Sequence, residues 1–145
     1  MNSEVVPQAA TERLLHGEYW SRGGDGRVTL IARECTACNA CYLPGIVTCV
    51  NCKGTAFRER RIASPGTLYT YTIVRGSGGV WPDVYAIGYV DFEAEKVRVC
   101  GHIKETDAAA LRIGMTMNVE EATLYTEAGG TQVKCFRFHA AKGTP

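Results

Sequence analysis

The chain has 145 residues, of which 46% are hydrophobic, and its formal net charge is +1. This length suits one domain, or a small module joined to a compact domain, and the hydrophobic content excludes a wholly disordered chain. The balanced charge argues against nucleic acid or an anionic membrane as a partner, and no run of about 18 apolar residues predicts a membrane span. Residues 1–10 lack the basic and apolar regions of a secretory signal, so we expect a cytoplasmic protein.

Residues 1–27 are predicted to form a loose tail followed by one helix. Thr11 can cap a helical stretch over residues 9–20, which carries Tyr19 and Trp20 on an apolar stripe. A glycine-rich turn then ends the helix. Two aromatic side chains on so short a helix need a surface to pack on, which is either the chain's own barrel or a partner.

A cysteine-rich segment dominates residues 28–63, between predicted strands at 28–33 and 57–62. Two C-x-x-C pairs lie ten residues apart, and each pair suits a tight turn that aims two thiolates at one metal ion. Four thiolates around Zn²⁺ leave no position open for water or substrate, so such a zinc is structural. The pattern therefore predicts a rubredoxin-like zinc ribbon whose ligands are Cys35, Cys38, Cys49 and Cys52.

The same cysteines leave alternatives open. Two disulfides would use the same residues, and the ligand set could hold iron as a one-electron centre. Cys41 forms a further C-x-x-C with Cys38, but Cys35 is favoured as the ligand because a strand leads directly into its turn. Cys100 and Cys135 lie within predicted strands, where buried, inert thiols are expected.

Residues 64–145 are predicted to form a β-barrel after a break at Ser64-Pro65-Gly66. Five segments are rich in β-branched and aromatic residues, and a short helix lies between the third and the fourth. This order matches the five-stranded OB-fold, although another five-stranded antiparallel barrel has the same pattern. The predicted strands are 66–75, 84–92, 96–103, 115–125 and 132–138, with the helix at 106–111.

No motif of a catalytic centre is found, so no catalytic residue is predicted. The three histidines are isolated from one another, and no glycine-flanked nucleophile, Walker-type loop or dinucleotide-binding loop occurs. Cys100 and His102 share one face of a predicted strand, where core packing is the favoured interpretation. Arg58 and Arg60 are candidates for phosphate contact, with an ordinary solvated strand as the alternative.

These motifs together resemble the DUF35 family, whose members combine a zinc ribbon with an OB-fold and accompany acyl-CoA enzymes. The resemblance covers nearly the whole chain, including the ten-residue gap between the cysteine pairs. Asn39 and Lys53 replace the glycines that usually follow each pair, and Gly45 and Ile46 replace a Pro-Arg dipeptide. The segments that carry the resemblance are 19–20, 35–39, 42–46, 49–53, 64–72 and 113–115.

The resemblance implies a non-catalytic accessory subunit of a thiolase-type acyl-CoA complex. Such a subunit joins a thiolase-like partner in a hetero-oligomer and helps to form the channel for CoA or acyl-CoA. The partner's residues would perform thiolysis of a 3-oxoacyl-CoA, or acyl transfer. The alternatives are an accessory subunit of a MaoC-like hydratase or acyl-CoA aldolase, a single-stranded nucleic-acid-binding module, and an iron-bearing electron carrier. The predicted partner or CoA contacts are Tyr19, Trp20, Trp81, Arg58 and Arg60.

Overall fold

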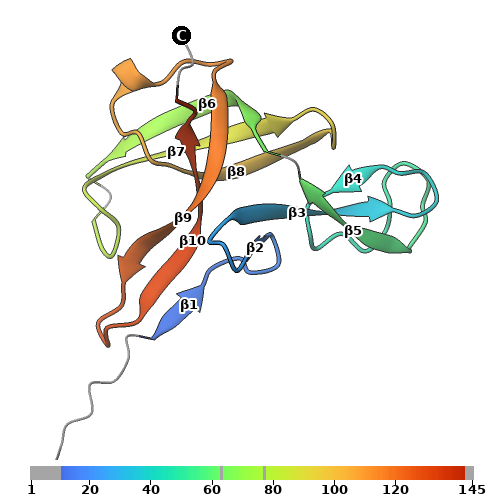
Figure 1. The fold of residues 1–145 in the computed structure, drawn as a ribbon, viewed down its shortest axis with the longest axis horizontal. Coiled ribbons are helices and arrows are strands. Elements are labelled where there is room, and N and C mark those ends of the chain that lie inside the picture. Colours follow the sequence, from blue (N-terminus) through green and yellow to red (C-terminus); the bar gives the residue numbers. More distant parts are fainter. Residues whose placement is uncertain (1–10, 63, 77, 143–145) are drawn as a thin grey trace, which may run out of the picture.

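The structure, a computed structural model, describes residues 11–62, 64–76 and 78–142. Apart from one short 3-10 helix, η1 (Ala108–Ala110), the regular structure of these residues is all β-strand. Figure 1 shows a barrel at the upper left and a smaller sheet that projects to the right. The mainly β class is therefore confirmed. No helix in the described part of the chain is long and apolar enough to cross a membrane.

The barrel is closed by five strands. Strand β9 pairs with both β6 and β10, and β10 also pairs in parallel with β8, so the order β6-β7-β8-β10-β9 returns to its start. Element η1 lies between β8 and β9, where a longer helix was predicted. The strand order and the position of the helical turn agree with the predicted OB-fold. The strands are β6 (Gly66–Arg75), β7 (Val84–Phe92), β8 (Val97–Ile103), β9 (Thr116–Thr126) and β10 (Gln132–Ala140).

Alternation along the strands fills the barrel. In β7 the buried residues are Ala86, Gly88, Val90 and Phe92, and the residues between them are more exposed. The period of two sends one face of the strand into the core and the other toward solvent. Side chains from the other strands complete this core, among them the fully buried Leu68, Met117 and Phe138.

Gly88 is required by the close approach of neighbouring strands. A Cβ at this position would lie 2.5 Å from the carbonyl oxygen of Thr70 and 2.8 Å from Cδ1 of Ile103. We therefore expect Gly88→Ala to lower the free energy of unfolding by about 1–3 kcal/mol, measured by denaturant titration. Gly24→Ala is the matched control, because a Cβ there meets no atom within 4 Å. Equal stabilities of the two variants would contradict the prediction.

The smaller sheet is built around β3 (Val28–Cys35). One edge of β3 pairs with β2 (Trp20–Arg22) and β4 (Cys41–Tyr42), and the other pairs with β5 (Phe57–Ile62). All these pairings are antiparallel, and β3 leads directly into the first cysteine turn, as predicted. The β5 bounds agree with the predicted strand.

The predicted N-terminal helix is wrong for the described residues. Strand β1 (Glu12–Leu14) pairs in parallel with β10, a turn follows with His16 at φ 54°, and β2 pairs with β3. A helix of about 12 residues is marginal without packing, and strand pairing with distant segments satisfies the same backbone groups. Residues 9 and 10, like the predicted tail, lie outside the described residues. The segment is thus shared between the two sheets, and the domain division at residues 28 and 64 stays a prediction.

A β-bulge gives Tyr69 and Tyr71 different surroundings, although alternation alone would place both on one face of their strand. The pairing of β6 with β7 shifts register between Leu68 and Thr70. Tyr69 is therefore 49% exposed, and the guanidinium of Arg98 lies 3.3 Å from its ring centroid, whereas Tyr71 packs against the core. The extra residue of a bulge reverses which side chains of the strand face the core. Alternation along the sequence therefore no longer predicts burial beyond the bulge.

Candidate metal centre and adjoining clefts

Four cysteine sulfurs converge at the end of the ribbon sheet. The Sγ atoms of Cys35, Cys38, Cys49 and Cys52 all lie within 4.8 Å of one another. The Cys35–Cys52 sulfur distance is 3.6 Å and the Cys38–Cys49 distance is 3.5 Å. Sulfurs placed 2.3 Å from a tetrahedral zinc would be about 3.8 Å apart, whereas a disulfide needs about 2.0 Å. The cluster thus fits a four-thiolate metal site, consistent with structural zinc, and the cysteines are free thiols.

Two similar turns aim the four thiols. In the first, the amide of Asn39 donates to the carbonyl of Cys35 at 2.9 Å, and in the second, Lys53 donates to Cys49 at the same distance. Both turns end in a left-handed residue, with φ 64° at Asn39 and 66° at Lys53. Asparagine tolerates this conformation and lysine does so less well, so strain is concentrated at Lys53.

Lys53→Gly should therefore stabilise the protein. Glycine removes the steric cost of the left-handed conformation, and we expect a gain of about 1 kcal/mol in the free energy of unfolding, measured in the presence of zinc. Asn39→Gly is the matched control, because Asn39 also accepts a 2.8 Å hydrogen bond from Arg58 that glycine cannot make. We expect no gain there, and a larger gain at position 39 than at 53 would refute the assignment of strain.

Hydrogen bonds surround the sulfurs. The hydroxyl of Tyr42 lies 3.4 Å from Sγ of Cys49, and this contact is the main reason that the pKa of Cys49 falls to about 6. The amide of Gly54 donates to Sγ of Cys52 at 3.4 Å. That contact lowers the pKa of Cys52, but the neighbouring thiols of Cys35 and Cys38 outweigh it and raise this pKa to about 12. The contact with Tyr42 thus favours the thiolate form of Cys49.

Cys41 does not belong to the cluster. Its sulfur lies 3.5 Å from Oε2 of the buried Glu34, and burial together with that carboxylate raises its pKa. The structure thus decides between the overlapping C-x-x-C pairs. Of the remaining cysteines, Cys135 is buried as predicted, and burial raises its pKa to about 11, whereas the thiol of Cys100 is exposed.

Three comparisons relate this fold and cysteine cluster to known proteins. The family model described as ChsH2, C-terminal OB-fold domain, matches residues 59–120. A curated DUF35 domain-containing scaffold protein from Methanocaldococcus jannaschii is 29% identical over 92 residues, which cover 61% of this chain and 64% of that relative. The solved structure entitled Ltp2-ChsH2(DUF35) aldolase superposes with a TM-score of 0.61 at 18% identity, covering 75% of this chain and 84% of that one.

The chain is thus similar to DUF35 proteins in its barrel sequence and in its fold. The match to the curated relative spans just under two thirds of that relative's length. The likeness to the solved structure shows a shared fold. Neither the family description nor these two names assigns a function to an individual residue of this chain.

Two of the predicted contact residues are held by Glu34, whose side chain is 6% exposed. Nε of Arg58 donates to its Oε1 at 2.7 Å, and Arg60 donates to Oε2. These hydrogen bonds, that of Arg58 first, hold the pKa of Glu34 below its usual range. Both arginines line a cleft of about 840 Å³, and Glu95 and Lys96 line it too. The cleft joins the ribbon to the β7–β8 turn.

The three predicted aromatic contacts have different surroundings. Trp20 is 1% exposed, and its indole N–H donates to the carbonyl of Leu15 at 2.8 Å, so it lacks the exposed surface on which the predicted contact depended. Tyr19 is half-buried beside a small apolar pocket. Trp81 is half-buried and stacks on His102, with ring centroids 5.2 Å apart and planes at 20°. The pattern of aromatic residues had offered no means of separating core from surface.

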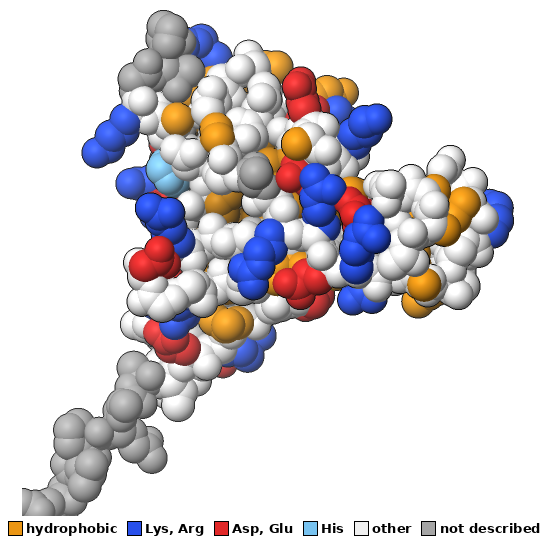
Figure 2. Space-filling model, turned by 45° about the vertical axis from the view of Figure 1, so that its right-hand side comes forward, with side chains coloured by type: hydrophobic (Ala, Val, Ile, Leu, Met, Phe, Trp, Pro, Cys, Tyr) orange, Lys and Arg blue, Asp and Glu red, His pale blue; other side chains and the backbone are white. Residues whose placement is uncertain are grey.

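The surface of the protein shows further features that sequence reasoning missed. Val47 and Val50, in the cysteine-rich loop, are 77% and 67% exposed. Hydrophobic side chains are visible on the projecting ribbon in Figure 2, where basic and acidic side chains lie interspersed across the rest of the view. Exposed valines beside a metal cluster are one signal of an interaction surface, since a monomer gains nothing by leaving them in water.

Proposed function

We propose that this protein is a non-catalytic accessory subunit of a thiolase-type acyl-CoA complex. The observation that carries the proposal is the union of a four-cysteine ribbon with an OB barrel in a chain related to a protein named as a scaffold. Its ribbon and barrel would hold the partner enzyme, whose own residues perform thiolysis of a 3-oxoacyl-CoA or acyl transfer. The complex would act in the cytoplasm.

Zinc in this proposal is structural. Cys35, Cys38, Cys49 and Cys52 would hold it, and the bound ion would supply folding free energy to the ribbon. Four protein ligands leave no coordination position for a substrate, so the metal takes no part in acyl chemistry.

Acyl-CoA is proposed as a ligand shared with the partner. The cleft beside the ribbon carries three cations, Arg58, Arg60 and Lys96, against two carboxylates, which leaves one excess positive charge at its wall. Arginines held by a carboxylate are pre-oriented, and guanidinium groups bind phosphate oxygens well. Tyr19 and Trp81, which keep accessible surface, are the proposed aromatic contacts to the partner.

An aldolase is the second candidate partner. The solved structure with the same fold is entitled an aldolase complex, which favours carbon–carbon cleavage of an acyl-CoA by the partner. The role of this chain would be unchanged, and only the reaction of its partner would differ.

The test is capture of the tagged full chain from its native cytosol, with mass spectrometry of co-purifying proteins and enzyme assays of the complex. A thiolase-like partner with 3-oxoacyl-CoA activity supports the first proposal, and an aldolase moves the second ahead of it. Recovery of the chain alone or with nucleic acid would overturn both. A Tyr19→Ala, Trp81→Ala double variant should weaken the complex, with Leu14→Ala, a change at an exposed apolar residue, as control.

A further inference from the structure

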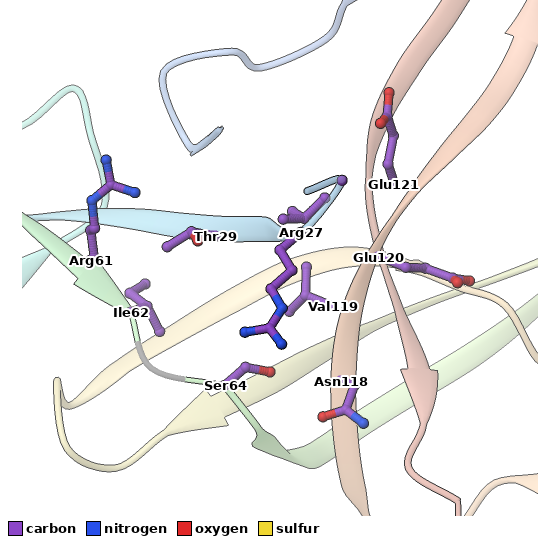
Figure 3. Close-up of a pocket in the computed structure, with 11 residues that line it drawn as sticks. Arg27, Thr29, Arg61, Ile62, Ser64, Asn118, Val119, Glu120 and Glu121 are labelled. Carbon is purple, nitrogen blue, oxygen red and sulfur yellow. The ribbon is translucent and has the colours of Figure 1, made fainter. Parts of the chain in front are cut away.

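A second cleft, of about 660 Å³, lies where the ribbon sheet meets the barrel (Figure 3). Strands β3 and β5 supply one side, β9 supplies the other, and Ser64 enters from the connection between β5 and β6. Val28, Ile62 and Val119 give it an apolar part. Small-molecule sites commonly measure on the order of 300–1,000 Å³, so the cleft has room for an organic ligand and not only for an ion.

Hydrogen-bonding groups from three segments converge in this cleft. Figure 3 shows the guanidinium of Arg27 extending toward the side chains of Ser64 and Asn118. Among the residues that the structure describes, neither Ser64 nor Asn118 has a side-chain hydrogen bond. The guanidinium of Arg27, with a hydroxyl and a carboxamide that have no side-chain hydrogen bond, forms a set of donors suited to the oxygen atoms of an anion.

The carboxylates in the lining do not oppose an anion at this position. Glu120 accepts a 2.8 Å hydrogen bond from Arg137, and Glu121 pairs with Arg22 at 2.5 Å. In Figure 3 the carboxylate of Glu120 lies across β9 from Arg27, and that of Glu121 lies farther along the strand. Their charges are thus neutralised by arginines that belong to other parts of the surface.

The arginines of the cleft are themselves weakly paired. Arg27 has Asp25 at 3.5 Å, with the two side chains 88% and 63% exposed, and Arg61 has Glu59 at 4.0 Å. Exposed ion pairs of this kind contribute little, because solvent screens them and long side chains lose freedom in forming them. Both guanidinium groups therefore remain available to a ligand.

We propose that this cleft binds a phosphate group of an organic anion, with Arg27 as the charged contact and Ser64 and Asn118 as neutral contacts. A phosphate presents enough oxygen atoms for all three groups, and a guanidinium binds two of them in parallel. The adjacent apolar residues would contact the organic part. The site is separate from the cleft of Arg58 and Arg60.

The phosphate could come from CoA, which carries a 3′-phosphate and a diphosphate, or from free phosphate. The test is an NMR titration of the purified full chain, with the side-chain signals of Arg27 and Asn118 followed during addition of CoA, 3′-dephospho-CoA and inorganic phosphate. We expect saturable shifts of these signals. Tighter binding of CoA than of 3′-dephospho-CoA assigns the 3′-phosphate, equal binding assigns the diphosphate, and binding of inorganic phosphate as tight as that of CoA assigns free phosphate.

Arg27→Gln and Asn118→Ala should each weaken the binding by at least about fivefold. The matched control is Arg33→Gln, since Arg33 is exposed on β3, which begins directly after Arg27, but does not line the cleft. Absence of saturable shifts up to about 10 mM ligand, or equal losses in the control, would overturn the proposal. The titration uses no partner enzyme, so its failure would leave the accessory role standing, and failure of partner capture would leave this site standing.

Discussion

Cys49→Ser should abolish stable zinc binding and, with it, the order of the ribbon. Cys49 is 0% exposed and lies in the four-sulfur cluster, where serine supplies a harder, more weakly coordinating oxygen. We expect zinc affinity to fall by at least about 100-fold, because the binding free energy of a structural zinc is folding free energy. Elemental analysis of the purified variant should give far less than one zinc per chain, and amide hydrogen exchange should accelerate in β3, β4 and β5.

Cys41→Ser is the matched control for this experiment. Cys41 lies close to the cluster and in a C-x-x-C of its own, yet its sulfur contacts Glu34 and not the four clustered thiols. This variant should keep one zinc per chain and the wild-type pattern of exchange. Loss of zinc in Cys41→Ser, or its retention in Cys49→Ser, would contradict the ligand assignment. If the elemental analysis found iron in place of zinc, the ligand assignment would stand and only the identity of the metal would change.

Trp20→Ala should be among the most destabilising substitutions in the chain. The indole is 1% exposed in the core and donates a hydrogen bond to Leu15. Its removal leaves a large cavity and an unpaired carbonyl, so we expect a loss of about 3–5 kcal/mol in the free energy of unfolding. Denaturant titration monitored by circular dichroism measures the change.

Trp81→Ala supplies the comparison, since the chain has two tryptophans. Trp81 is half-buried on a loop, where its contacts are with aromatic rings that remain partly solvated. We expect a loss of about 1 kcal/mol, together with weaker capture of the partner. Similar stabilities of the two alanine variants would mean that the burial of Trp20 is not what holds the N-terminal segment. Unchanged capture by Trp81→Ala would remove Trp81 from the proposed interface.

Local patterns were enough to predict most of the strands. The segments 57–62, 66–75 and 84–92 have the predicted bounds because β-branched and aromatic residues are dense there and turn residues flank them. The four clustered cysteines also followed from spacing, since a C-x-x-C turn aims both thiols in one direction. These features depend on interactions between residues that are close together in the chain.

Determined by the sequence alone, then, were the mainly β class, most of the strands and a cysteine pattern suited to one metal ion. The tertiary structure alone decided that residues 12–22 form strands, that Trp20 is buried, and that Cys41 contacts Glu34 outside the cluster. In each of these cases the contact that decides the outcome is made with a backbone or side chain that is distant in the chain or lies on the far side of a turn. A helical stripe and a paired strand offer similar local energies, so long-range pairing and burial selected between them.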